Sequence, residues 1–267
     1  GVSGSAAADA ASDCKILVPE MARRGYSMEF CAAVTVASSL ITPIIPPGMG
    51  LIIYSMAAGV SVGRMFAAGY APGILTMVFF MIYVHFVAKK RGYVSNRTKA
   101  APLKEILKLF RHAIWAFLMP FGLIMGLRAG MLTASETGAF ACVYCAIIGV
   151  FVYKEFKKED IIPTIIESVM GTASVMIIMC AANVLAYFLS YESVPRTVTQ
   201  WIVGVGVGKY GFLFIVNIFV LILGMFVSNG MIPILAALLS PVAASLGIDS
   251  ILFGIVIVFG VTIGNMT

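Results

Sequence analysis

Three prolines beside three hydroxyl side chains form the group of residues in this chain that could do ion chemistry. They interrupt an otherwise apolar segment: Pro43, Pro46 and Pro47, next to Ser38, Ser39 and Thr42. Proline has no backbone N–H, so carbonyl oxygens one turn earlier lose their helical donors. Within a membrane such oxygens must be buried in protein or line a cavity. Carbonyl and hydroxyl oxygens suit a hard monovalent cation such as Na⁺, and half-helix N-termini suit a carboxylate. A plain proline kink is the alternative.

A second polar interruption lies near the other end of the chain. It consists of a tip and a helix break: Ser228, Asn229 and Gly230, and then Gly264, Asn265 and Thr267. Because an asparagine in mid-membrane is costly unless it is paired, we expect a functional site here. Asn183 and Asn217 also lie in apolar segments, and we expect them to form hydrogen bonds between helices.

The two interruptions belong to stretches that resemble each other. Each has a Gly/Ser tip followed by a proline, a glycine and an apolar helix, and residues 1–5 form the first tip. Pro19 and Pro241 are 222 residues apart, as are Gly25 and Gly247. Broken helices at corresponding places in two halves of a membrane chain indicate the binding site of a transporter.

The composition excludes a soluble globular protein. The chain is 61% hydrophobic and 11% charged, whereas soluble domains are about 25% charged. Its apolar spans exceed the roughly 20 residues that a bilayer helix needs, and they lack the alternation of an outer-membrane barrel. We therefore predict an all-α polytopic membrane protein. The five cysteines all lie in apolar stretches and indicate neither a disulfide framework nor a zinc site.

The basic residues determine the predicted orientation. They concentrate at residues 23–24, 89–111 and 154–158, which the positive-inside rule places in the cytoplasm. This explanation replaces nucleic-acid binding, so we expect no nucleic-acid partner. With the basic clusters inside, the two tips enter the bilayer from opposite faces. The predicted fold is a pair of inverted repeats with two re-entrant helical hairpins and two broken transmembrane helices.

The predicted organisation has four segments. Residues 1–88 hold the first hairpin arm, broken helix and next transmembrane helix, 89–111 a cytoplasmic basic loop, 112–208 connecting or scaffold helices, and 209–267 the second hairpin with half of its broken helix. Within them we expect an amphipathic interfacial helix at 102–111 and a polar external segment at 191–209. Both ends lie inside such elements, so we expect a fragment of a longer protein that continues with Pro-Pro.

Carboxylates add two further hypotheses. Asp9 and Asp13 are one helical turn apart and share a face, where they either coordinate an ion or form a polar stripe with Lys15. Glu136 follows Thr133 by three residues, the spacing of an N-terminal capping box.

Six stretches carry a resemblance to a known family. They are GVSGSAAADAA at Gly1–Ala11, VPEMARRGY at Val18–Tyr26, FCAAVTVASSLITPIIPP at Phe30–Pro47, GMLTASETGAFACVY at Gly130–Tyr144, GMFVSNGMIPILAALLSP at Gly224–Pro241 and FGIVIVFGVTIGNMT at Phe253–Thr267. Together they resemble the large membrane subunit of tripartite ATP-independent periplasmic (TRAP) transporters. The resemblance implies a Na⁺-coupled symporter of elevator type in the bacterial inner membrane, which is not an enzyme and has no organic cofactor.

The same resemblance implies partners and site residues. The partners are a small TRAP membrane subunit, a periplasmic substrate-binding protein, the lipid bilayer and an organic acid such as a C4-dicarboxylate or sialic acid. The first Na⁺ site would comprise Ser3, Gly4, Ser5, Ser38, Ser39, Thr42 and Pro43, and the second Ser228, Asn229, Gly230, Gly264, Asn265 and Thr267. The substrate would lie between the tips, near Ser5, Asp9, Pro47, Gly48, Ser228 and Asn229. Gly48 and Ser228 replace a serine and an acidic residue of the family pattern, so no particular organic acid is transferred.

Two other functions remain open at this point. A stand-alone divalent-anion/Na⁺ symporter also has two hairpins, and its Ser-Asn-Thr tips are similar to Ser228-Asn229. An intramembrane serine protease would use the GxSG motif at Gly1–Gly4, with Ser3 as nucleophile and His85 or His112 as base. That interpretation leaves the second hairpin unexplained. Because each site would lack part of its hairpin or broken helix, we also expect no transport by this chain alone.

Overall fold

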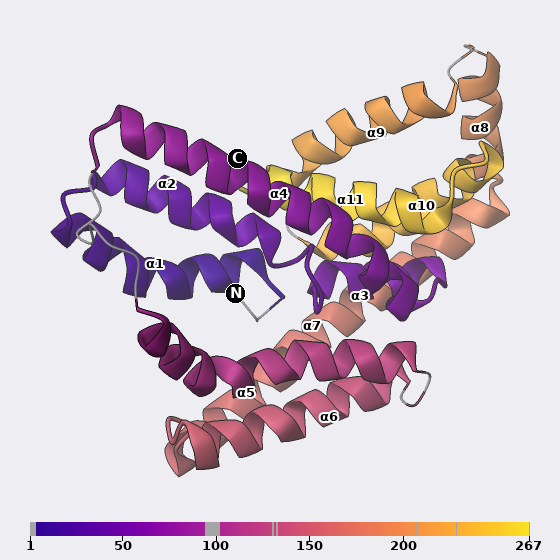
Figure 1. The fold of residues 1–267 in the computed structure, drawn as a ribbon. Helices are drawn as coiled ribbons and strands as arrows, with labels where there is room; N and C mark the ends of the chain where they lie inside the picture. The colour runs from indigo at the N-terminus through magenta and orange to yellow at the C-terminus, as the bar shows by residue number, and fades with distance from the viewer. Residues whose placement is uncertain are drawn as a thin grey trace. The chain divides into compact units, whose positions relative to one another are not determined.

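The computed structural model describes residues 4–93, 102–129, 131, 133–204, 206, 208–227 and 229–266, apart from the side chains of Arg128, Ala134, Ile202, Val203 and Asn229. All regular elements in these ranges are helical (Figure 1). The chain forms two compact units. One combines Gly1–Val94 with Met176–Thr267, and the other is Ser95–Val175. All candidate site residues belong to the first unit.

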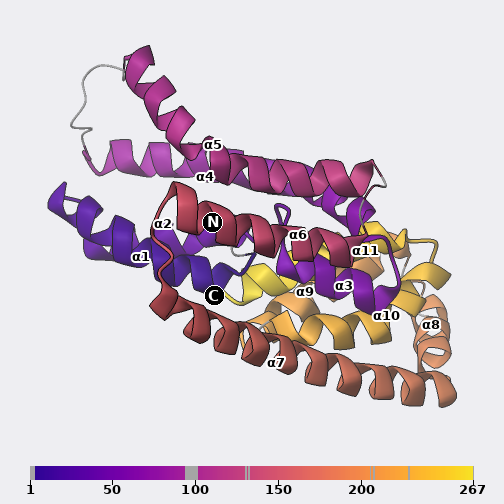
Figure 2. The same ribbon diagram turned by 90° about the horizontal axis from the view of Figure 1, so that it is seen from below.

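The first unit contains two groups of helices. The first group is α1 (Ala6–Arg23), α2 (Met28–Ser38), the 3₁₀ turn η1 (Ser39–Ile41), α3 (Met49–Ala58) and α4 (Val62–Lys90). The second group is α8 (Val194–Gly204), α9 (Lys209–Gly224), the 3₁₀ turn η3 (Asn229–Met231), α10 (Ile232–Ser245) and α11 (Ser250–Gly264). Figures 1 and 2 show α9, α10 and α11 gathered at one side of this unit and α1, α2 and α4 at the other.

The second unit is built on a helical hairpin. Its elements are α5 (Leu103–Arg128), α6 (Ala134–Ile147), the π-helical turn η2 (Ile148–Val152) and the first part of α7 (Lys158–Tyr191), whose remainder belongs to the first unit. The Tyr144 hydroxyl donates to the Trp115 carbonyl at 2.7 Å and so ties α6 to α5. The predicted capping box is confirmed, because Thr133 and Glu136 exchange side-chain and backbone hydrogen bonds at the start of α6.

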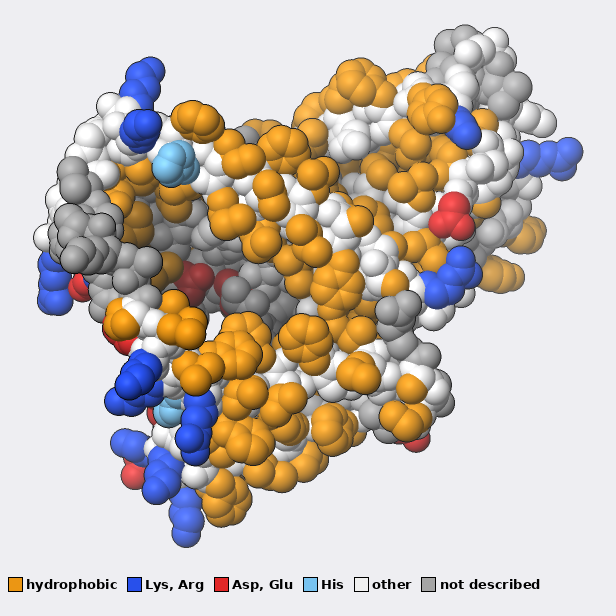
Figure 3. Space-filling view, viewed as in Figure 1, with side chains coloured by type: hydrophobic (Ala, Val, Ile, Leu, Met, Phe, Trp, Pro, Cys, Tyr) orange, Lys and Arg blue, Asp and Glu red, His pale blue; other side chains and the backbone are white. Residues whose placement is uncertain are grey.

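Four helices are long and apolar enough to cross a membrane: Val62–Lys90, Leu103–Leu127, Ser135–Val152 and Lys158–Tyr191. The helices predicted as hairpin arms and half-helices of the broken spans are shorter, at 10–17 residues, apart from α1. In Figure 3 apolar side chains cover the length of α4, and Lys and Arg side chains gather at its C-terminal end. That end carries Lys89 and Lys90, as expected for a cytoplasmic terminus.

The loops that join α1 to α2 and α10 to α11 have the same hydrogen-bonding pattern. Both are Schellman motifs, in which two successive N–H groups bond back to carbonyls in the last helical turn. The bonds run from Gly25 to Ala22 and from Tyr26 to Met21 in the first loop, and from Gly247 to Ala244 and from Ile248 to Ala243 in the second, all at 3.0–3.2 Å. The two glycines have φ values of 84° and 71°. The 222-residue spacing therefore relates two corners of one backbone geometry.

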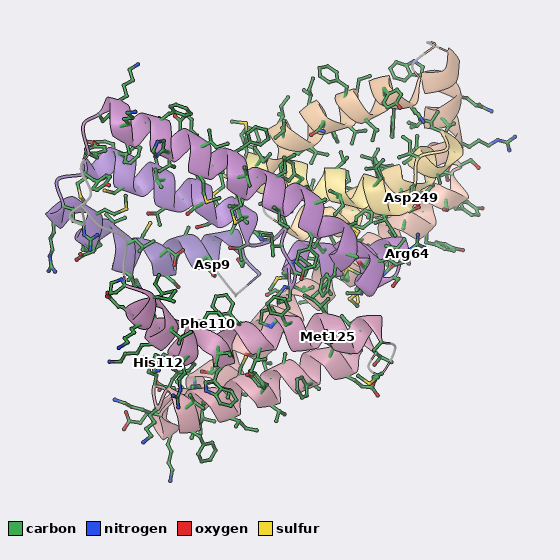
Figure 4. All side chains as sticks on the ribbon, viewed as in Figure 1. Asp9, Arg64, Phe110, His112, Met125 and Asp249 are labelled. Atoms are coloured by element: carbon green, nitrogen blue, oxygen red, sulfur yellow. The ribbon has the colours of Figure 1, made fainter. Side chains whose placement is uncertain are left out.

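The helices that follow these corners also begin at equivalent positions. Ser27 caps α2 by accepting a hydrogen bond from the Phe30 N–H at 3.4 Å. Asp249, 222 residues later, caps α11 through the N–H groups of Ile251 and Leu252 (Figure 4). Since short oxygen-bearing side chains are the preferred N-caps, both helix starts follow from local sequence.

The core of the first unit forms around α3 and α11. α11 packs against α9, α10, α3 and α4. Tyr54 on α3 is fully buried, and its hydroxyl donates to the Ser250 carbonyl at 2.9 Å. Gly254 on α11 leaves space for the Tyr54 ring and the end of Met65. The first group of helices is therefore joined to the second through their backbones as well as their side chains.

Three sequence expectations differ from the structure. The stretch 102–111 is not a separate helix, since Leu103–Arg128 forms one continuous α5. The segment 191–209 contains the helix α8, whose Thr199 hydroxyl lies 3.2 Å from that of Ser245 on α10. Asn183 does not bond to another helix, because its side-chain N–H donates to the Met179 carbonyl of its own helix at 2.9 Å. Local back-bonding satisfies this amide without a neighbour.

Candidate functional site

The first tip is attached to the first helix break through the backbone of Gly4. The Met49 N–H donates to the Gly4 carbonyl at 3.2 Å. Gly4 has φ +72°, and a Cβ there would lie 2.7 Å from the Pro47 oxygen and 3.0 Å from the Met49 nitrogen. Only glycine fits this position, because a side chain would meet both the left-handed backbone and the carbonyl.

The break itself leaves several carbonyl oxygens without helical donors. After η1, the N–H groups of Ile44 and Ile45 both bond to the Ile41 carbonyl, at 3.2 and 3.0 Å. Pro46 and Pro47 follow and have no N–H, so the carbonyls of Thr42 and Pro43 lose the donors that a continuous helix would supply. Gly48 packs directly on the Pro43 oxygen, and α3 begins one residue later. The predicted interruption is therefore a true helix break.

Buried hydroxyl groups lie beside these carbonyls. Ser38 and Ser39 both donate to the Thr35 carbonyl at 2.9 Å, and Thr35 donates to the Cys31 carbonyl at 2.8 Å. Thr35, Ser39 and Thr42 are 1%, 2% and 6% exposed. Because each serine uses its single proton on Thr35, its lone pairs remain available as acceptors. Sequence inspection missed Thr35, which sits one turn before the predicted serines.

Asp9 is buried on α1, one turn beyond the first tip (Figure 4). Its side chain is 6% exposed, and its N–H bonds to the Ser5 carbonyl at 3.1 Å. Asp13 is half-buried and Lys15 exposed. No ion pair joins either aspartate to Lys15 among the described residues, so the predicted polar stripe lacks that salt bridge. Ser3 lies outside the described residues.

The second site is built on close contact between α9 and α11. A Cβ on Gly264 would lie 2.5 Å from the Leu221 oxygen, and one on Gly224 would lie 2.8 Å from the Val261 oxygen. Asn265 caps the end of α11 through its N–H and has an exposed side chain. Gly230 packs near Ile178 of α7. Ser228, Thr267 and the Asn229 side chain lie outside the described residues.

The structure brings the first break and the end of the second tip together. Gly50, two residues after Gly48, packs against Ile232 at the start of α10 and against Val258 on α11. Ile232 follows Gly230 by two residues. The backbone next to Gly4 therefore meets the helix that leaves the second hairpin tip. The predicted substrate position between the tips has its two sides in one unit.

The donor set of the first site fits Na⁺ and not a transition metal. Among the described residues there is no group of three or more His, Cys, Asp and Glu side chains placed to hold a metal ion. The oxygens present are the carbonyls of Thr42 and Pro43 and the buried hydroxyls of Ser39 and Thr42. Neutral oxygen ligands select hard cations.

The two histidines have structural surroundings. The His112 ring lies edge-on to Tyr153, whose hydroxyl donates to the His112 carbonyl at 3.0 Å. His85 is exposed and lies edge-on to Phe86, its neighbour on α4. Neither contact involves a serine.

Comparison with known proteins gives one family. The family model "Tripartite ATP-independent periplasmic transporter, DctM component" matches residues 1–267. A C4-dicarboxylate TRAP transporter large permease protein from Pseudomonas aeruginosa is 33% identical over 267 residues, which cover 100% of this chain and 62% of that protein.

Two further relatives have other printed substrates. A sialic acid TRAP transporter permease from Haemophilus influenzae is 32% identical over the whole chain and 43% of its own length. An isethionate TRAP transporter permease from Oleidesulfovibrio alaskensis is 32% identical, again over the whole chain and over 42% of its own length. The chain thus spans less than two thirds of each of these relatives. It belongs to the DctM component family of the tripartite ATP-independent periplasmic transporters.

Proposed function

We propose that this chain is part of the large permease subunit of a Na⁺-coupled importer of an organic anion. In this proposal a periplasmic binding protein delivers the substrate, and a small membrane subunit completes the transporter. The hairpins enter the bilayer from opposite faces, and the first unit moves across it as an elevator. The observation that carries the proposal is the pairing of each tip with a glycine-packed helix break within one unit.

The coupling ion would be held by neutral oxygens. Na⁺ supplies positive charge that offsets the charge of the bound anion. At the first site the carbonyls of Thr42 and Pro43, with the hydroxyls of Ser39 and Thr42, would hold it. Gly4 keeps the tip in contact with Pro47 and Met49, which holds this part of the break in a single geometry. At the second site Gly264 and Asn265 would contribute backbone oxygens.

The substrate class follows from chemistry that the relatives share. Their printed substrates are C4-dicarboxylate, sialic acid and isethionate, all of which are organic anions. Buried hydroxyls and freed half-helix termini, placed where the break meets α10, suit an anion paired with Na⁺. We therefore expect an organic anion, with a carboxylate as the first candidate.

Uptake into proteoliposomes tests the proposal. The complete transporter, with its small subunit and binding protein, is supplied with labelled C4-dicarboxylates, sialic acid and isethionate, with and without an inward Na⁺ gradient. The expected result is uptake of one class that requires both Na⁺ and the binding protein.

The other outcomes separate the alternatives. Uptake that needs Na⁺ but no binding protein would identify a stand-alone symporter. Uptake that ignores the Na⁺ gradient would contradict the proposed coupling, and no uptake of any anion on the panel would contradict the proposed substrate class.

A further inference from the structure

We propose that Gly69 on α4 is a positioning residue for the first cation site, acting through the backbone of Ile44. The inference rests on the proposed function. Gly69 does not belong to either predicted site, and sequence inspection assigned it to an ordinary transmembrane helix. The only sequence signal is the Gly69-x-x-x-Gly73 spacing, which allows two membrane helices to approach closely.

The inward face of α4 is narrow and rests on two glycines. Of its 29 residues, those buried are Met65, Phe66, Gly69 and Gly73. Met65 packs against Gly254 of α11. The two glycines instead face the broken helix, at Ile44 and Ile45. The described part of α4 therefore contacts the first site through positions that have no side chain.

The two glycines make different kinds of contact. A Cβ on Gly69 would lie 2.5 Å from the Ile44 carbonyl oxygen and 3.0 Å from the Cδ1 atom of Leu51. A Cβ on Gly73 would meet the Ile45 side chain, with Cδ1 at 3.2 Å. A side chain can change rotamer, whereas a carbonyl oxygen moves only with its peptide. Alanine at 69 thus shifts the break itself, and alanine at 73 shifts one side chain.

The break has little freedom to absorb such a shift. Ile44 is 1% exposed, and its N–H is bonded to Ile41. Two residues before it lies Thr42, and three residues after it lies Pro47, which contacts Gly4. A displaced Ile44 peptide therefore moves the carbonyls of Thr42 and Pro43, which are the proposed cation ligands. A displacement of even 1 Å is large beside the precision that preorganised sites need.

The test compares Gly69→Ala with Gly73→Ala in the complete transporter. The Na⁺ concentration for half-maximal uptake and the maximal rate are measured for both variants and the parent. We expect Gly69→Ala to raise the half-maximal Na⁺ concentration by about tenfold, which corresponds to about 1.4 kcal/mol. The maximal rate per folded transporter at saturating Na⁺ changes less. Gly73→Ala leaves the half-maximal Na⁺ concentration close to that of the parent. Equal shifts in the two variants, or a loss of folded protein with no change in Na⁺ dependence, would overturn the inference.

A second measurement separates this inference from the proposed function. Amide hydrogen exchange is followed in peptides that cover residues 41–52. Faster exchange of Ile44, Ile45 and Met49 in Gly69→Ala, but not in Gly73→Ala, shows that Gly69 positions the break even if uptake needs no Na⁺. Unchanged exchange in both variants would reject the positioning role, whatever the transporter carries.

Discussion

At Gly4 two separate costs oppose any larger side chain. The residue has φ +72°, which costs about 1–2 kcal/mol for a residue with a Cβ, and its Cβ would also contact the Pro47 oxygen at 2.7 Å. We expect Gly4→Ala to weaken Na⁺-dependent uptake strongly, because the tip must then separate from the break. Uptake at several Na⁺ concentrations measures the effect.

Gly59 supplies the matched control for this substitution. It has φ +66°, but an added Cβ would meet nothing within 4 Å. Gly59→Ala therefore carries the backbone cost without the clash and should retain the Na⁺ dependence of the parent. If both alanine variants lose uptake equally, the contact between Gly4 and Pro47 has no role of its own.

Ser39 and Ser55 form a second matched pair. Both are buried, and both donate to the carbonyl four residues earlier, at 2.9 and 2.7 Å. Each loses about 1 kcal/mol of hydrogen bonding as alanine. We expect only Ser39→Ala to raise the Na⁺ concentration for half-maximal uptake, because only Ser39 lies beside the break. Ser39→Thr keeps the hydroxyl and should restore the affinity in part. Equal behaviour of both alanine variants would remove Ser39 from the cation site.

Residue types indicated part of the site and missed the rest for a physical reason. Pro43, Pro46 and Pro47 were visible because proline always removes a donor, whatever surrounds it. Gly69 was not visible, because a glycine matters only through what lies against it, and its neighbour Ile44 is 25 residues earlier in the chain. Asn183 was misassigned because the sequence shows a buried-type amide but not its bond to Met179.

At the scale of elements, the crossing of α9 and α11 is a direct contact of backbones. Alanine at Gly264 would place a Cβ 2.5 Å from the Leu221 oxygen. Overpacking of this kind costs about 1–3 kcal/mol, which exceeds the roughly 0.5–1 kcal/mol that alanine gains over glycine in a helix. We expect Gly264→Ala to lower the thermal unfolding midpoint in detergent.

The control for this crossing is Gly171→Ala on α7, where an added Cβ meets nothing within 4 Å. Only the helical gain of alanine applies there, so the midpoint should stay or rise. A midpoint that is unchanged in Gly264→Ala would mean that α9 can move away from α11 at little cost.

Element boundaries were predictable where local chemistry determines them. The corners at Gly25 and Gly247 and the caps at Ser27 and Asp249 follow from a few adjacent residues. α8 was missed because its polar and apolar residues alternate at helical spacing within a segment that also holds glycines. The join between 102–111 and the next span was missed because a change of polarity does not by itself end a helix.

At the scale of the whole molecule, the orientation rests on charge and on the length of α7. Its 34 residues extend about 51 Å at 1.5 Å per residue, more than the roughly 30 Å of a hydrocarbon core. In a variant without the native cysteines, we expect Glu192→Cys to react with a membrane-impermeant thiol reagent in intact cells. Lys157→Cys, at the other end of α7, should react only after the membrane is opened. Labelling of Lys157→Cys alone in intact cells would reverse the orientation.

The bond between Tyr54 and Ser250 sets an order on the synthesis of the protein. The two residues are 196 positions apart, and ribosomes add about 5–20 residues each second. Tyr54 therefore enters the membrane roughly 10–40 s before its acceptor exists. During that interval its hydroxyl has neither water nor Ser250, and Gly254 has not yet arrived to cover its ring. The first repeat must wait, inserted but incompletely packed, until the ribosome has made the second.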